Sequence, residues 1–105
     1  MFDFCVVGGG MVGSAMALGL AKIGFNVAII EPSMPVLFDS KQAPDLRVSA
    51  ISITSETLLQ DLGAWLHIKN MRLCPYKRLS VWDKPSCRTD FDCKAIEQPH
   101  LGHII

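Results

Sequence analysis

The sequence predicts an α/β fold that begins with a strand–helix–strand unit around a parallel sheet. Two apolar, partly β-branched runs, residues 2–7 and 26–31, flank a segment rich in Ala, Leu and Met, residues 11–23, that favours helix. Glycines end the first run and Pro32 follows the second, as expected for strands that are buried on both faces of a parallel sheet. Because crossovers of this kind join parallel strands, we expect the two runs to be neighbours in one sheet.

The composition is that of a globular chain and excludes several classes of partner. The 105 residues can form one modest folding unit with a buried core, and 50% of them are hydrophobic while 19% are charged. Lys plus Arg equals Asp plus Glu at ten each, so we expect no nucleic-acid partner. The four cysteines lack C-x-x-C spacing, so we expect neither a zinc site nor disulfides in the chain. Free cysteines indicate a reducing compartment, and we expect the cytoplasm.

Turn and cap residues divide the rest of the chain into smaller elements. Gly24 is positioned to end the first helix, and the proline-containing segment 32–45 is expected to be a loop. Residues 47–53 return to an extended, β-branched pattern.

A second helix is expected to follow that extended segment. Thr54 or Ser55 is predicted to cap a helix that runs to about Leu62 and stops at Gly63. The remaining expected elements are a short helical turn, the two strands of a hairpin and an incomplete final element, at residues 64–70, 77–83, 88–93 and 101–105.

A glycine motif joins the first strand to the first helix. Gly8, Gly10 and Gly13 form a G-x-G-x-x-G pattern, and Glu31 follows at the end of the second strand, 18 residues after the last glycine. In a Rossmann-like βαβ unit this pattern binds a dinucleotide: the glycines permit a tight turn, close approach of a diphosphate and close packing of the helix. The first amides of the helix, including those of Met11 and Val12, would hold the diphosphate.

Glu31 is predicted to accept hydrogen bonds from the ribose of the adenosine half. A carboxylate at this place would repel a 2′-phosphate, so FAD and NAD remain as candidates and NADP is disfavoured. The alternative is a plain tight turn in which Glu31 is only a solvated strand end, and the matched context of strand, loop, helix and acid favours the binding site.

Four later segments, together with the glycine loop, resemble a known family. They are residues 45–52 (DLRVSAIS), 58–65 (LLQDLGAW), 75–83 (PYKRLSVWD) and 99–102 (PHLG). With the loop GGGMVG, they closely resemble the flavin-dependent hydroxylases of ubiquinone biosynthesis, and the resemblance covers essentially the whole chain.

The resemblance implies a class A flavoprotein monooxygenase with FAD as cofactor and NAD(P)H as electron donor. In that family the reduced flavin uses O₂ to hydroxylate a polyprenyl quinol, so the resemblance assigns catalysis to the cofactor and nominates no catalytic side chain and no metal. Arg47 matches an arginine that lies along the cofactor in the family. Its alternative role is an ion pair with Asp45 or another nearby carboxylate that merely holds the loop.

The resemblance also implies that the fold is incomplete relative to the family, whose members are several-fold longer. Residues 1–105 are then the N-terminal part of an FAD-binding domain, inactive alone, made of a βαβ unit (2–31), a loop with helices (32–70), a β-hairpin region (77–93) and a truncated element (101–105). Unpaired strand edges predict self-association. A lipid-tailed substrate implies a place at the inner-membrane surface or in a multi-enzyme complex.

Other chemically interesting residues are expected to be structural. His67, His100 and His103 share no familiar ligand spacing, so we expect no metal or catalytic role for them. Trp65 and Trp82 are expected in the core. Two alternative functions remain at this stage: another FAD-dependent oxidoreductase of the same sheet type, or a non-catalytic nucleotide-binding or interaction module.

Overall fold

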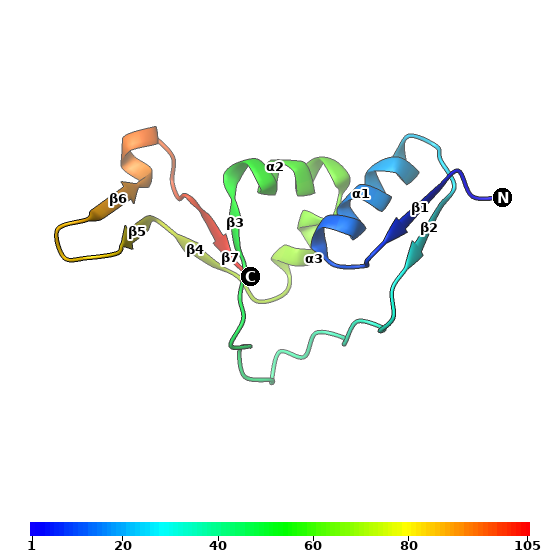
Figure 1. The fold of residues 1–105 in the computed structure, drawn as a ribbon, viewed down its shortest axis with the longest axis horizontal. Coiled ribbons are helices and arrows are strands. Elements are labelled where there is room, and N and C mark those ends of the chain that lie inside the picture. Colours follow the sequence, from blue (N-terminus) through cyan, green and yellow to red (C-terminus); the bar gives the residue numbers. More distant parts are fainter.

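The computed structural model describes all 105 residues as a small α/β chain with one parallel and two antiparallel sheets (Figure 1). The elements follow one another as β1 (Phe4–Val7), α1 (Met11–Lys22), β2 (Val27–Ile30), β3 (Ala50–Ser52), α2 (Ile53–Leu62), α3 (Trp65–Lys69), β4 (Cys74–Tyr76), β5 (Arg78–Trp82), β6 (Arg88–Asp92), the 3₁₀ helix η1 (Cys93–Ile96) and β7 (Gly102–Ile104). None of the helices has the length and apolarity that crossing a membrane requires.

The first unit has the predicted order and pairing. β1 and β2 are parallel neighbours, in register from Phe4 opposite Val27 to Val7 opposite Ile30. The α1 helix joins them and ends as predicted before Gly24, whose φ of +100° is a conformation that glycine adopts without strain. The predicted strand–helix–strand start of the chain is therefore confirmed.

The expected burial of these strands is wrong for this chain. Val7 is 82% exposed and Ile30 is 57% exposed, although both side chains are apolar. In Figure 1 α1 lies along one side of β1 and β2, and no second layer covers the other side. The sequence pattern shows what a strand is suited to pack against, whereas burial also needs the partner layer.

The structures of segments 32–45 and 64–70 also agree with the sequence predictions, whereas the N-cap residue of α2 differs from the predicted one. No helix or strand forms between β2 and β3, and α3 lies within the predicted helical turn. The N-cap of α2 is Ser52, not Thr54 or Ser55: the Ser52 hydroxyl accepts a hydrogen bond from the backbone N of Ser55 at 3.3 Å. β3 ends at this cap, so the helix starts sooner than predicted. Gly63, with φ of +82°, ends it as expected.

The last residues of the chain form the central strand of a sheet. β7 pairs antiparallel with β3 on one side and with β4 on the other, so the sheet order is β3-β7-β4. The predicted element at residues 101–105 is thus a strand, paired on both sides. β4 was not predicted at all, because Pro75 within it weakens the strand pattern, and the edge position of β4 is where proline is tolerated.

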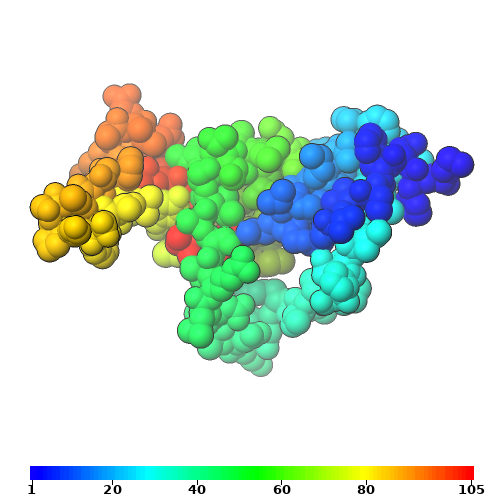
Figure 2. Space-filling view, in the orientation of Figure 1, coloured from blue at the N-terminus to red at the C-terminus, as the bar shows by residue number.

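The chain is elongated and has almost no closed core. Its principal extents are 56 × 31 × 28 Å and its radius of gyration is 17.0 Å, against about 13 Å for a compact domain of 100 residues. Only four residues are buried: Ala17, Glu56, Cys93 and Gly102. Figure 2 shows the parallel unit, the central helices and the hairpin spread along the long axis. The length of the chain allows a buried core, but few side chains are buried in it.

The two tryptophans have different surroundings. Trp65 is half-buried and its ring centroid lies 5.5 Å from that of His103. Trp82, at the end of β5, is 66% exposed, so its predicted core position is wrong. The β5–β6 hairpin projects from the rest of the chain in Figure 1. All four cysteines are free thiols, and only Cys93 is buried.

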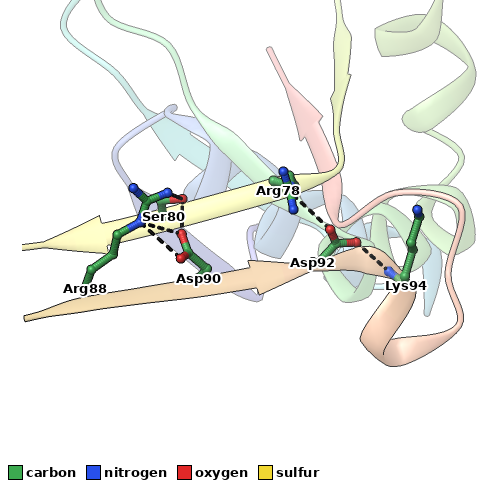
Figure 3. A network of polar contacts seen from close by, with 6 residues as sticks. All are labelled: Arg78, Ser80, Arg88, Asp90, Asp92 and Lys94. Atoms are coloured by element: carbon green, nitrogen blue, oxygen red, sulfur yellow. Dashed lines mark hydrogen bonds and ion pairs between the residues drawn. The ribbon is translucent and has the colours of Figure 1, made fainter.

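The β5–β6 hairpin forms as predicted and carries a polar network on its strands (Figure 3). Asp90 accepts hydrogen bonds from the Ser80 hydroxyl and from Arg88 Nε, the latter at 2.9 Å. Asp92 accepts from the backbone N of Lys94 and from Arg78 Nε, both at 2.9 Å. The Ser80–Asp90 and Arg78–Asp92 pairs join facing residues of β5 and β6, and cross-strand polar pairs of this kind help to fix register.

These contacts predict an acid-sensitive hairpin. The Ser80 hydrogen bond, with help from Arg88, holds the pKa of Asp90 below its ordinary value of 3.8, and the Lys94 amide, with help from Arg78, does the same to the pKa of Asp92. A lowered folded-state pKa means that the stabilisation is complete above the unfolded value and is lost as pH falls through the folded one. We therefore expect the hairpin to loosen below pH 3.8, measured as faster amide exchange in β5 and β6.

Asp90→Asn should reduce that pH dependence by removing the contribution of Asp90 and leaving that of Asp92, whereas Asp45→Asn, in a loop outside the hairpin, should leave it unchanged. An unaltered pH profile in Asp90→Asn would show that the network does not govern the hairpin.

Candidate functional site

The glycine loop connects the end of β1 to the start of α1 through a close backbone approach. Gly8 has φ of +101°, which favours glycine. A Cβ at Gly13 would lie 1.9 Å from the carbonyl oxygen of Gly8, so α1 can approach the loop only with a hydrogen at this position. The Ser14 hydroxyl donates to the carbonyl of Gly9 at 2.9 Å and closes the turn from the helix side.

The loop presents unpaired amides at the positive end of α1. Gly10 is the N-cap of the helix, and no side chain caps it. The first amide with a backbone acceptor is that of Ser14, which donates to the Gly10 carbonyl at 2.8 Å. The amides of Met11, Val12 and Gly13 therefore have no acceptor in the chain, and they lie at the positive end of the helix dipole.

Glu31 lies at the same loop, held by two backbone amides. The Gly9 amide donates to its Oε2 at 2.6 Å, and the Ser33 amide donates to its Oε1 at 3.2 Å. A carboxylate has about four acceptor positions, so both oxygens keep capacity for a further donor. The fit is tight, because a Cβ at Gly9 would lie 3.1 Å from the Glu31 side chain. Glu31 is thus exposed but fixed in place, unlike the freely solvated strand end considered as its alternative.

Arg47 comes to the loop from a distant part of the chain. It lines a hollow of about 540 Å³ together with the loop and neighbouring side chains: Val6, Val7, Gly8, Gly10, Met11, Val12, Gly13 and Met16. It also lines a larger hollow of about 830 Å³, whose wall includes residues of the 36–49 segment. Arg47 forms no ion pair within the chain, so the predicted alternative of a pair with Asp45 does not occur. Its guanidinium is left available to an anion at the loop.

One constellation was missed by sequence reasoning. Glu56, in the first turn of α2, faces His100, which lies two residues before β7, and His103, which lies within β7. His100 and His103 follow Glu56 by 44 and 47 positions in the chain, so no local sequence motif contains all three residues. The signal that could have found them is the pair of histidines three residues apart around Gly102. His67 stands apart, exposed on α3.

Comparison with known proteins gives the family. The chain is 44% identical over 103 residues to 3-demethoxyubiquinol 3-hydroxylase of Escherichia coli (strain K12), a match that covers 98% of this chain and 26% of that protein. It is 40% identical over 111 residues to the mitochondrial ubiquinone biosynthesis monooxygenase COQ6 of Xenopus tropicalis, covering 100% of this chain and 24% of that protein. The chain belongs to the ubiquinone-biosynthesis hydroxylase family. The family predicted from the loop and the four later segments is confirmed.

The chain is also 42% identical over 88 residues to human mitochondrial COQ6, a match that covers 79% of this chain and 19% of the human protein. No family model matches the chain. The chain thus spans about a quarter, or less, of the length of these hydroxylases and monooxygenases. The elongated shape and the bare faces of β1 and β2 are consistent with a part of a larger fold.

Proposed function

We propose that this chain is the FAD-binding N-terminal part of an NAD(P)H-dependent aromatic hydroxylase of ubiquinone biosynthesis. The observation that carries the proposal is the group of unpaired amides at Met11, Val12 and Gly13, which opens on the hollow that Arg47 lines. A diphosphate needs such donors at a helix N-terminus, without side chains in the way. In this proposal β1, α1 and β2 are the Rossmann-like unit of the whole enzyme.

Each site residue has a task in this proposal. Gly8 and Gly13 shape the turn, and the amides at Met11 and Val12 bind the diphosphate of FAD. Gly10 leaves space for it, since a Cβ there would meet nothing within 4 Å. Glu31 accepts hydrogen bonds from the adenosine ribose through the capacity that the Gly9 and Ser33 amides leave unused. Arg47 places its charge beside the diphosphate.

FAD, when bound, supplies the oxidation chemistry, with NAD(P)H as the reductant and O₂ as the oxidant. The described residues bind and orient its adenosine half. By resemblance, the substrate is a polyprenyl quinol, and the pattern is most similar to that of 2-polyprenyl-3-methyl-6-methoxy-1,4-benzoquinol hydroxylase. We propose the cytoplasm as the compartment, at the membrane surface or in a multi-enzyme complex that gives access to a lipid-tailed quinol. Self-association of the chain through its open strand edges stays a prediction, which light scattering tests.

Titration with ADP tests the proposal on the part of the cofactor that these residues would hold. We expect saturable one-to-one binding of ADP in calorimetry and at least ~10-fold weaker binding by Gly10→Ala, equivalent to about 1.4 kcal/mol. Gly10 has φ of −68° and free space around it, so alanine should fit without a clash, and its weaker N-cap preference should lower the melting temperature only slightly. A loss of ADP binding with only this small loss of stability would separate a ligand site from a merely structural turn.

Equal ADP affinity in Gly10→Ala and the unaltered chain would contradict the site. A chain that binds neither ADP nor FAD at millimolar concentration would instead favour the non-catalytic interaction module. A flavin spectrum that persists through gel filtration would distinguish FAD from NAD as the preferred dinucleotide.

A further inference from the structure

A nearly buried carboxylate faces two imidazoles at the start of α2, away from the glycine loop. Glu56 Oε2 lies 3.3 Å from His100 Nε2, and Glu56 Oε1 is in hydrogen-bond contact with His103 Nδ1. The Glu56 side chain is 7% exposed, that of His103 14% and that of His100 23%. The three side chains therefore form one compact cluster with a solvent opening at His100.

The backbone brings this cluster together through a close contact of two strands. Gly102 lies between the histidines, and a Cβ there would be 1.9 Å from the carbonyl oxygen of Ile51 in β3. β7 can therefore lie close to β3 only with glycine at this position. The Ser52 cap ends β3 and turns the chain into α2, which places Glu56 over β7.

Aromatic contacts hold the rings in place. The His103 ring packs against Trp65 of α3 at 5.5 Å and against His100 at 4.6 Å between ring centroids. Side chains held by packing lose little further freedom when they bind a ligand, which favours a preformed site.

The charge of Glu56 has no fixed compensation inside the chain. Its only ion-pair partners are the two histidines, and no lysine or arginine contacts it. With both imidazoles neutral, a carboxylate that is almost out of water keeps an unbalanced charge, which is unfavourable. A cation shared by all three residues would remove that imbalance without adding protons.

We propose that Glu56, His100 and His103 form a binding site for a divalent first-row metal ion, with Zn²⁺ as the ion. One donor atom from each residue lies within 4.8 Å of the other two. Tetrahedral Zn²⁺ with bonds of about 2.0–2.1 Å separates its ligands by about 3.3 Å, so the donors need only small movements. Three protein ligands leave the fourth position to water or to an added ligand.

Titration of the chain with ZnCl₂ tests the site. We expect one-to-one binding in calorimetry, weakened at acid pH because ligating imidazoles must be neutral. In NMR spectra the ring resonances of His100 and His103 should shift on saturation, while those of the exposed His67 should not. This readout needs no variant, so it does not depend on any substituted chain folding.

CoCl₂ gives an independent spectroscopic test. Binding through imidazole and carboxylate should produce visible d–d bands without the intense near-ultraviolet absorption of a cobalt–thiolate bond. This distinguishes the proposed site from adventitious binding by the four free cysteines. Thiolate absorption, or one-to-one binding that leaves the rings of His100 and His103 unshifted, would overturn the proposal.

The matched pair of variants is His103→Ala and His67→Ala. Each removes one imidazole, and only the first removes a proposed ligand. We expect Zn²⁺ affinity to fall at least ~10-fold in His103→Ala and to stay unchanged in His67→Ala. Equal affinity in the two variants, or no Zn²⁺ binding by the unaltered chain at 100-fold excess, would show that the cluster is a metal-free hydrogen-bond network. The outcome is independent of whether the glycine loop binds ADP.

Discussion

Gly13→Ala should destabilise the β1–α1–β2 unit and abolish ADP binding. The added Cβ would lie 1.9 Å from the carbonyl oxygen of Gly8 and 3.4 Å from a methyl of Val6. The first obstacle is backbone, so no rotamer change relieves it, and α1 must move away from the loop. Overpacking of this kind costs about 1–3 kcal/mol, partly offset by the helix propensity of alanine, about 1 kcal/mol. We expect a net loss of up to about 2 kcal/mol, measured by thermal melting with circular dichroism.

Gly19→Ala is the matched control for this prediction. It makes the same substitution in the same helix, but its Cβ would meet only Leu62 Cδ2 at 3.6 Å, an ordinary contact. Alanine should therefore stabilise α1 there by about 1 kcal/mol through propensity alone. If Gly13→Ala melts as high as Gly19→Ala and still binds ADP, the close approach of helix and loop has no role in the site.

The parts of the fold that the sequence predicts are those with local signals. The β1–α1–β2 order follows from hydrophobic runs interrupted by Gly8 and Gly24, and the β5–β6 hairpin follows from two alternating runs around a turn. Within the site, Gly13 and Glu31 belong to one fingerprint and are found together at the loop. Arg47 was nominated only through family resemblance, and the structure places it beside that loop.

The parts that the sequence does not predict depend on contacts between distant segments. β7 becomes a central strand only because β3 and β4, from two other regions, pair with it. The Glu56 cluster depends on the same pairing: the spacing of His100 and His103 could point to a pair, but nothing in the sequence predicts that Glu56 faces them. The prediction that β1 and β2 are buried is wrong for a related reason. Apolar patterning in β1 and β2 indicates which faces can be covered, and coverage itself depends on a layer that this chain does not provide.

Gly102→Ala should disrupt the β3-β7-β4 sheet and, with it, the proposed metal site. A Cβ at this position would lie 1.9 Å from the carbonyl oxygen of Ile51 and 3.0 Å from Tyr76 Cε1. The central strand is thus blocked on both sides, by backbone on one and by an aromatic ring on the other. We expect a loss of about 2–3 kcal/mol, near the upper end for overpacking, because β7 joins both pairings of the sheet.

Hydrogen exchange would locate that effect. The amides of Ser49 and Ile105 donate to each other's carbonyls at 2.9 Å, and the Leu101 amide donates to Tyr76 at 2.8 Å. These amides should exchange faster in Gly102→Ala, while those of the β5–β6 hairpin should not change. Ala50→Val, which adds bulk at an exposed position of β3 in the same sheet, should leave the exchange rates close to those of the unaltered chain.

The same variant links the sheet to the Glu56 cluster. Gly102→Ala keeps all three proposed ligands, so a loss of Zn²⁺ binding in it would come from displacement of His100 and His103 relative to Glu56. Retained Zn²⁺ affinity together with retained amide protection would mean that β7 accommodates a methyl group at Gly102. The close β3–β7 contact would then not be what holds the two histidines against the helix.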